Sequence, residues 1–494
     1  MDSRALNQKW NPIQSDPGRS RRASDASERW RWRDVMEVAN HDQVWLRLQE
    51  LHVPEIATRP NKCLGSLPGE LVPYVTIARS ETPFRFTRER ERKYGPVFKT
   101  SLLTGKTIMI TDVEGVKFVL HNEGVLFETG YPQSLKDVLG ERAMLFHHGD
   151  LQKRMHAMLK RFVSSTPLKK YLTREMELLT KQGMSTWSRG QRILLQDEIQ
   201  RITHDFLMKQ LFGLEPGKLS TTILEEFNTL MAGIIGVPMM IPGTPYFKAM
   251  KAREKLSQII MDMVAARRAR PDIEHKDILN ALIEEVKEED GDVEKIIIDN
   301  VLVNIANAEG IPAIVIAFAV KNLSETPKAL EHIREENLAI KRGKDSNEGL
   351  SWNDYMSLEF TQAVFNETLR LANGAQGVMR KALKDVEYRG YIIPKGWTVL
   401  PYFLNIHFDE NMFPNPTKFH PWRWLEKNIP STYVLPFGGG SRLCPGQELA
   451  RVQTAVFLHH FVTQFKWDAE PETVINFPKI STRNHVPVVL YDLH

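Results

Sequence analysis

The fold of this chain is decided by one stretch, Phe437-Gly438-Gly439-Gly440-Ser441-Arg442-Leu443-Cys444-Pro445-Gly446. Its cysteine is one of only 2 in the chain, and a helix is expected directly after it, from about Gln447 through Phe465. The amides and dipole at a helix N-terminus favour negative charge, and glycines let backbone N–H groups approach the sulfur closely. The stretch therefore predicts a thiolate surrounded by hydrogen-bond donors, which is a suitable ligand for haem iron.

The same stretch fills every fixed place of the pattern F-x-x-G-x-R-x-C-x-G, through Phe437, Gly440, Arg442, Cys444 and Gly446. It resembles the haem-binding loop of the cytochrome P450 family. The resemblance implies haem b (iron-protoporphyrin IX) held by the axial thiolate of Cys444, with cofactor contacts from Phe437, Gly438, Arg442 and Gly446. The alternative is a buried structural cysteine on a tight turn, which the matched positions and the following helix disfavour.

Composition excludes several classes of protein. Lys+Arg number 65 against 61 Asp+Glu, a net charge of +4, so no nucleic-acid partner is expected. Cys63 and Cys444 lie far apart in sequence and cannot form a disulfide framework, which fits a reducing compartment. No H-E-x-x-H motif is present in the sequence, so a zinc hydrolase is not supported.

Residues 1–60 differ from the rest because they are rich in arginine and serine, with Trp30 and Trp32 interleaved. They predict a disordered extension or a transit-like leader before a catalytic domain over residues 61–494, and their acidic residues weaken the leader alternative. No apolar run of about 18 residues occurs, and the nearest, Ile305 to Val320, is expected to be a buried core helix. The resemblance implies the endoplasmic reticulum membrane surface, without the family's usual N-terminal transmembrane helix.

Most of the chain after about Thr87 has helical patterns. Short β signals occur at residues 97–100 and 107–110, which predict a hairpin, and again between Lys384 and Val399. No alternating βα rhythm is found, which disfavours a Rossmann or barrel fold. We expect a mainly α protein with small β-sheets. The resemblance implies the cytochrome P450 fold, with haem between a long distal helix and the proximal helix that follows the cysteine loop.

An acid and a base stand three residues apart at Glu367 and Arg370, so they share a face if this segment is helical. Alone, such a pair is usually a solvated surface pair. The segment Phe419-His420-Pro421-Trp422-Arg423-Trp424 resembles the family's source of a second arginine. The resemblance thus implies a buried network of Glu367, Arg370 and Arg423 beneath the haem, which fixes the cysteine loop.

Haem carries two propionates, which need cationic or N–H donors. Arg442 lies two residues before the cysteine, and Arg380 matches the family's propionate arginine. The family's third contact falls on Gln152-Lys153-Arg154-Met155-His156, where His156 stands in place of an arginine and Arg154 could substitute. The alternative is that Arg154 belongs to a solvated basic face. Such a face could also attract the electron donor that the resemblance implies, NADPH-cytochrome P450 reductase.

The expected distal helix contains Asn307-Ala308-Glu309-Gly310-Ile311-Pro312, where the family usually has an acid beside a hydroxyl. Glu309 supplies the acid, and no Thr or Ser stands next to it. Pro312 removes a helical N–H and its ring clashes with the carbonyl of Ala308, so a kink is expected between these residues. We expect Glu309 and ordered water to deliver protons. The alternative is that Gly310 and Pro312 only bend a core helix.

The details of the resemblance point to one branch of the family. Ile311-Pro312 and the stretch from Gln152 to His156 look like plant brassinosteroid-pathway enzymes that hydroxylate a sterol side chain near carbon 23. This branch implies a steroid substrate, molecular oxygen and an apolar pocket, in an enzyme expected to be a monomer. Candidate lining residues, which are equally compatible with plain core, are Ile235, Val237, Met239, Met240 and Phe247.

The leading hypothesis is a haem-thiolate monooxygenase with Cys444 as the iron ligand and Glu309 as the proton donor. One alternative keeps the fold but rearranges peroxides or dehydrates its substrate, because some relatives tolerate the loss of the distal hydroxyl. The other is a haem-binding protein that has lost catalysis. The missing hydroxyl and the unusual residues 1–60 motivate both alternatives.

Overall fold

The computed structural model describes residues 84–494, except for residues 103–104, 235–237, 345–348, 373, 427, 476–479 and 494. Residues 1–60, for which an extension was expected, lie outside this part. The described chain is mainly helical, as expected from the sequence. Its helices are α4 (Arg85–Tyr94), α5 (Val113–His121), α6 (Gln133–Leu139), α7 (Asp150–Ser164), α8 (Thr166–Ser185), α9 (Leu195–Phe212), α10 (Lys218–Ala232), α11 (Pro245–Ala269), α12 (Ile278–Glu285), α13 (Val293–Ala308), α14 (Ile311–Ser324), α15 (Pro327–Arg342), α16 (Trp352–Met356), α17 (Glu359–Ala372), α18 (Phe403–His407), α19 (Arg423–Glu426) and α20 (Gln447–Gln464), with 3-10 turns η2 (Glu288–Asp290), η3 (Ser431–Tyr433) and η4 (Gly440–Arg442).

The strands form small sheets that carry one of the expected haem-contacting arginines. The largest has the order β1-β2-β8-β5-β3, in which only β2 and β8 run parallel. The expected hairpin is confirmed by the antiparallel pairing of β1 and β2. Arg380 begins β5. The strands are β1 (Val97–Leu102), β2 (Gly105–Ile110), β3 (Phe127–Thr129), β4 (Arg192–Leu194), β5 (Arg380–Ala382), β6 (Val386–Tyr388), β7 (Tyr391–Ile393), β8 (Thr398–Pro401), β9 (Phe465–Ala469), β10 (Val474–Ile475), β11 (Ser481–Thr482) and β12 (Pro487–Asp492).

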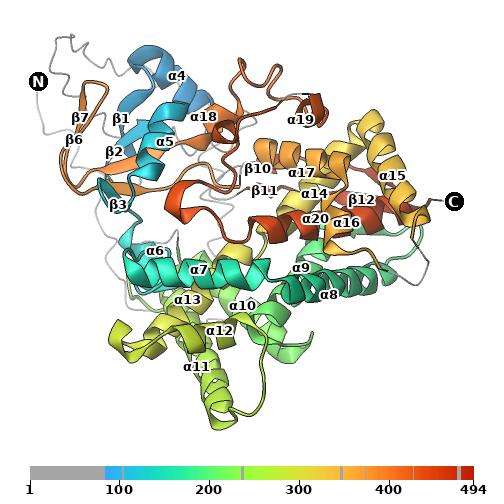
Figure 1. Cartoon of the computed structure of the whole chain (residues 1–494), viewed down its shortest axis with the longest axis horizontal. Coiled ribbons are helices and arrows are strands. Elements are labelled where there is room, and N and C mark those ends of the chain that lie inside the picture. The colour runs from blue at the N-terminus through green and yellow to red at the C-terminus, as the bar shows by residue number, and fades with distance from the viewer. Residues whose placement is uncertain are drawn as a thin grey trace, which may run out of the picture. The chain divides into compact units, whose positions relative to one another are not determined.

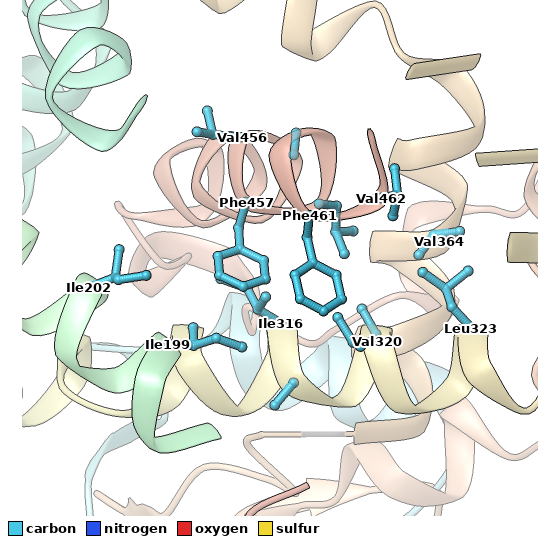
Figure 2. Packing of buried hydrophobic residues seen from close by; sticks show 14 of the residues in the cluster. Ile199, Ile202, Ile316, Val320, Leu323, Val364, Val456, Phe457, Phe461 and Val462 are labelled. Carbon is cyan, nitrogen blue, oxygen red and sulfur yellow. The ribbon is translucent and has the colours of Figure 1, made fainter. Parts of the chain in front are cut away.

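The helical core is built around α20, the helix that follows the cysteine loop. Figure 1 shows α20 beside α14, α16 and α17, with the β1–β2 sheet, α4 and α5 on the other side of the view. Figure 2 shows Phe457 and Phe461 of α20 directed toward Ile316 and Val320 of α14. These side chains are buried together with α9 and α17 residues. Burial of this apolar area, at roughly 25 cal/mol per Å², anchors α20 in the helical core.

The distal helix is interrupted where Pro312 predicts a kink. α13 ends at Ala308, and Gly310 takes a left-handed conformation with φ +80° before α14 begins at Ile311. Pro312 stands in the first turn of α14, where a missing N–H costs no helical hydrogen bond. The expected kink is thus confirmed, and it is a complete break.

The two distal segments together are apolar. Among the described residues, Val293–Ser324 is the segment long and apolar enough to cross a membrane, and 67% of its most apolar window is buried inside the protein. This burial agrees with the expected core helix over Ile305 to Val320. The segment therefore packs as core in this structure.

Replacing Gly310 by alanine tests the break. A Cβ at φ +80° is disfavoured, so the free energy of unfolding should fall by about 1–2 kcal/mol in urea titrations followed by circular dichroism. Gly343→Ala is the matched control, because Gly343 has φ −78° and its added Cβ would meet Ile340 O at an ordinary 3.6 Å. The control should change stability by no more than about 0.5 kcal/mol. Equal effects of the two substitutions would contradict the left-handed break.

Candidate functional site

The cysteine loop is held in shape by its glycines and by α5. Gly440 has φ +67°, and a Cβ there would lie 2.3 Å from the carbonyl oxygen of Leu120 in α5. The backbone N–H of Cys444 donates to the carbonyl of Phe437 at 3.0 Å, which closes the loop on itself. The loop continues through Gly446 into α20, close to the helix start that the sequence predicts. Only glycine fits the close approach at Gly440.

The loop does not ionise the sulfur unaided. Burial raises the pKa of the Cys444 thiol, and the backbone N–H of Gly446 acts in the opposite direction with a smaller effect. The donor nearest the sulfur in the loop therefore opposes the effect of burial on the pKa of Cys444 without cancelling it. A cation at the sulfur would stabilise the charged form, as metal coordination does for thiols.

The loop is joined to α17 by an aromatic contact. The rings of Phe437 and Phe365 stack with centroids 6.3 Å apart and planes at 28°. Phe437 packs against a buried cluster formed by Phe365 and Leu369 of α17 and Val315 of α14. This contact sets the loop against the helix that carries Glu367 and Arg370.

The structure brings Glu367, Arg370 and Arg423 together in the interior. Arg370 donates to both carboxylate oxygens of Glu367, at 2.8 and 2.9 Å, and Arg423 Nε donates to Oε1 at 3.1 Å. The three residues are 0%, 1% and 5% exposed, so this is no solvated surface pair. Burial alone would raise the pKa of Glu367. The hydrogen bonds and charge of Arg370, with the charge of Arg423, outweigh it and hold that pKa below its usual range.

Further hydrogen-bond donors, which no sequence motif indicates, complete the network around Glu367. The indole N–H of Trp424 and the backbone N–H of His420 donate to Glu367 at 2.9 and 3.0 Å. Both lie in the segment that was singled out for Arg423 alone. Arg370 also donates to the carbonyl of His407 at 2.8 Å. The carboxylate of Glu367 thus ties α17 to the segment from His420 to Trp424.

His407 extends the network toward the cysteine loop. Its Nε2 accepts the backbone N–H of Leu435 at 3.0 Å, two residues before Phe437. Burial, with the charge of Arg370, lowers the pKa of His407 to about 3, so the ring is neutral and able to accept. The α17 network is therefore connected to the start of the loop through α18.

Arg380 and Arg442, the two arginines expected to hold propionates, meet around one carboxylate. Arg442 Nε donates to Glu123 Oε1 at 2.7 Å, and Arg380 forms an ion pair with Glu123 Oε2. All three side chains are largely buried. Two guanidinium groups from β5 and the cysteine loop thus converge where a carboxylate is bound. Glu123 was not anticipated, because it follows α5 with no motif around it.

The other two propionate candidates both lie on α7. His156 on α7 has its Nε2 2.7 Å from the carbonyl of Leu443, next to the cysteine. Arg154 instead pairs with Asp290 at 2.5 Å and with Glu285 at 3.5 Å. Arg154 is therefore paired with acidic residues of η2 and α12. His156 lies beside the cysteine loop.

Glu309 lies at the break in the distal helix, and its carboxylate is turned to α9. Gln200 Nε2 donates to Oε1 at 3.0 Å, and His204 Nδ1 lies 2.9 Å from Oε2. Glu309 is 7% exposed. The acid that was expected to deliver protons with ordered water is therefore already bonded to two side chains of α9, and no motif pairs these side chains with it.

The expected pocket residues are divided. Ile235 and Val237 lie outside the described residues. Met239 and Met240 are 46% and 59% exposed, so the structure does not place them in a core. Phe247, in the first turn of α11, is partly buried.

Comparison with known proteins identifies the family. The model of the family described as Cytochrome P450 matches residues 67–488, so this chain belongs to the cytochrome P450 family. It is 36% identical to a 3-epi-6-deoxocathasterone 23-monooxygenase of Arabidopsis thaliana, over 90% of this chain and 92% of the relative. It is also 36% identical to an abietadienol/abietadienal oxidase of Pinus taeda, over 90% and 91% of the two chains.

A solved structure shows the same fold. The retinoic acid bound cyanobacterial CYP120A1 superposes with a TM-score of 0.74, over 83% of this chain and 94% of that chain, at 22% identity. The resemblance and fold class expected from the sequence are confirmed. The chain is a cytochrome P450 monooxygenase, which favours the leading hypothesis over peroxide rearrangement, dehydration or mere haem binding.

The family implies a haem-thiolate cofactor, and the residues present fit one. Haem offers two carboxylates at its edge and iron at its centre. Arg380 and Arg442 already hold the carboxylate of Glu123, so the guanidinium groups suit a propionate in charge and geometry. Cys444 is a free thiol, and a cysteine sulfur is a ligand that haem iron accepts.

The Glu367 network can be tested by Arg423→Ala. Removing this guanidinium leaves the buried carboxylate undercompensated, and the free energy of unfolding should fall by about 3–5 kcal/mol in urea. Glu89→Gln is the control. The Arg85–Glu89 ion pair has an N–O distance of 2.7 Å, against 3.1 Å for Arg423–Glu367, but its side chains are 67% and 49% exposed. The control should cost no more than about 0.5 kcal/mol. Similar losses for both variants would show that burial does not set the strength of the network.

Proposed function

We propose that this protein hydroxylates the side chain of a steroid, a brassinosteroid precursor, near carbon 23. It would use molecular oxygen and electrons from NADPH delivered by NADPH-cytochrome P450 reductase. The observation that carries the proposal is the 36% identity to a 3-epi-6-deoxocathasterone 23-monooxygenase, which extends over 90% of this chain. A similarity of this length includes the cysteine loop, the Glu367 network and the distal break.

The cofactor would be haem b, with the thiolate of Cys444 as its axial ligand. When bound, such a group supplies the activation of dioxygen. Phe437, Gly438 and Gly446 would line its proximal side. Arg380 and Arg442 would hold the propionates, and His156 would donate from α7. These roles are supported by the convergence of both arginines on one carboxylate.

The remaining site residues would work by fixing geometry and by moving protons. Glu367, Arg370 and Arg423 would hold the α17 platform against which the loop packs through Phe437. Glu309 would pass protons through its carboxylate at the distal break. No hydroxyl residue stands beside it in the sequence to share this role. Arg154 would serve the fold through its pairs with Asp290 and Glu285.

The domain organisation and location are part of the same proposal. Residues 61–494 would form the catalytic domain, preceded by residues 1–60 as an extension of another character. The protein would act as a monomer at the endoplasmic reticulum membrane surface, as plant relatives of this type are expected to do. Its near-balanced charge of +4 supports small-molecule substrates over nucleic acid.

A second candidate is oxidation of a diterpenoid alcohol or aldehyde. It is favoured by the equal identity, 36% over 448 residues, to the abietadienol/abietadienal oxidase. Both candidate substrates have rigid, apolar, fused rings with few polar groups, so a pocket for one is chemically close to a pocket for the other.

Reconstituted turnover separates the candidates. The haem-loaded protein, reductase and NADPH should convert 3-epi-6-deoxocathasterone to a product heavier by one oxygen, measured by mass spectrometry, and should leave abietadienol unchanged. Turnover of abietadienol alone would select the second candidate. Consumption of a fatty-acid hydroperoxide without reductase, and of neither terpenoid, would contradict monooxygenation. The control omits NADPH.

A further inference from the structure

A buried histidine connects the distal break to the beginning of another helix. His204 Nδ1 lies 2.9 Å from Glu309 Oε2, and His204 Nε2 lies 3.0 Å from Ser220 Oγ. The three residues are 4%, 7% and 3% exposed, in the order His204, Glu309 and Ser220. Three elements supply them: the junction of α13 and α14, the middle of α9 and the first turn of α10. Both ring nitrogens are therefore engaged by oxygen atoms on opposite sides.

We assign the hydrogen-bond directions along this row for an ionised Glu309 and a neutral ring; His204 Nε2 also lies 3.3 Å from the carbonyl oxygen of Ser220. A carboxylate only accepts, so His204 Nδ1 carries the proton in the bond to Glu309. Nε2 of the neutral ring then accepts from the hydroxyl of Ser220. The hydroxyl of Ser220 is thus the donor at the outer end of the row, and the carboxylate of Glu309 is the acceptor at its inner end. Between them, the ring of His204 can exchange protons at either nitrogen.

The outer end of the row lies just beneath the protein surface. Ser220 is the first buried residue of α10, and the segment immediately before it, residues 215–219, is exposed. The inner end lies at the break, where Glu309 and Gly310 leave helical geometry. A path of hydrogen-bonded polar atoms therefore runs from near solvent to the place where the distal helix opens.

We propose that Ser220, His204 and Glu309 form a proton relay that supplies the distal side of the cofactor site. The relay rests on the role proposed above for Glu309, and it assigns two further residues to proton delivery. It would compensate for the absence of a hydroxyl residue next to the acid in the distal helix. His204 and Ser220 act through Glu309, so both are positioning and relay residues.

The proton balance of the reaction requires such a supply. Monooxygenation puts one oxygen atom into the substrate and releases the other as water, and it consumes two electrons and two protons. The electrons come from NADPH through the reductase, and the protons come from solvent. In the relay, Nδ1–H of His204 passes its proton to Glu309 Oε2 while Nε2 takes one from Ser220 Oγ, which water restores. Rotation of the imidazole then returns a protonated nitrogen to Glu309.

A purely structural role for His204 predicts different behaviour. A structural histidine needs only to donate to Glu309, and glutamine can do the same. A relay histidine must also accept a proton on its far side and release one on its near side, which an amide cannot do.

The first test examines the ring itself in the haem-loaded protein. Long-range ¹H–¹⁵N spectra should show His204 as the Nδ1–H tautomer, with a ring proton that exchanges with solvent faster in the wild type than in Ser220→Ala. An Nε2–H tautomer, or exchange unaffected by Ser220→Ala, would overturn the relay. This readout does not depend on turnover.

The second test measures proton use with the variant His204→Gln. The share of NADPH electrons recovered in product should fall about tenfold, and the solvent deuterium isotope effect on NADPH oxidation should rise. The substrate-induced absorption shift and the carbon monoxide spectrum should remain as in the wild type, and Ser220→Ala should change coupling in the same direction. Unchanged coupling and isotope effect in His204→Gln would overturn the proposal.

Matched controls separate this result from other failures. His459→Gln replaces another buried histidine, bonded to Asn337 at 3.0 Å and away from the distal break. It should lower stability without changing coupling or the isotope effect. Reductase-driven formation of hydrogen peroxide without substrate also consumes two protons. The isotope effect on that reaction therefore tests the relay even if no steroid is a substrate.

Discussion

The arrangement of this site depends on one buried charge, the carboxylate of Glu367. Its position in the interior is tolerable only because Arg370 and Arg423 surround it, with N–H donors from Trp424 and His420 filling its remaining sites. Arg370 lies on the same helix, whereas His420, Arg423 and Trp424 lie 53 to 57 residues later, so satisfying one carboxylate ties α17 to that segment. Arg370 reaches His407, and His407 reaches Leu435 at the entrance of the cysteine loop. The start of the cysteine loop is thus tied by hydrogen bonds to the network of Glu367.

A second constraint acts on the opposite side of the site, where the distal helix is broken. Gly310 supplies a conformation that other residues avoid, and Pro312 begins the next helix where its missing N–H does no harm. The break frees Glu309 from helical geometry and lets its carboxylate bond to α9. One side of the site therefore contains the charge-compensated carboxylate of Glu367. The other contains the carboxylate of Glu309, at the point where the distal helix is interrupted.

The sequence predicts those parts of the fold that local chemistry determines. The hairpin of β1 and β2, the start of α20 after Gly446 and the interruption at Pro312 all follow from residue types in one short stretch. The distal kink was predicted because a proline acts on its own helix. The spacing of three residues also paired Glu367 with Arg370, whereas Arg423 was added to them by the resemblance to the cytochrome P450 family.

Partners that meet only in the folded chain were beyond prediction. Glu123 stands between Arg380 and Arg442, yet it lies hundreds of residues from both and belongs to no motif. His204 was one histidine among 15 and gave no sign of contacting Glu309. Arg154 was left open between two roles, because its acidic neighbours Asp290 and Glu285 come from other elements. The pKa of Cys444 shows the same limit, since burial outweighs the local donors that the sequence makes visible.

The central claim, that the sulfur of Cys444 binds haem iron, is tested most directly by the absorption spectrum of the reduced, carbon monoxide-bound protein. If Cys444 is the ligand, the spectrum should show the strongly red-shifted Soret band of a thiolate-ligated haem. That band should be lost in Cys444→Ser, while circular dichroism shows that the variant remains folded. A protein that takes up no haem, or a serine variant with the same Soret band as the wild type, would contradict it.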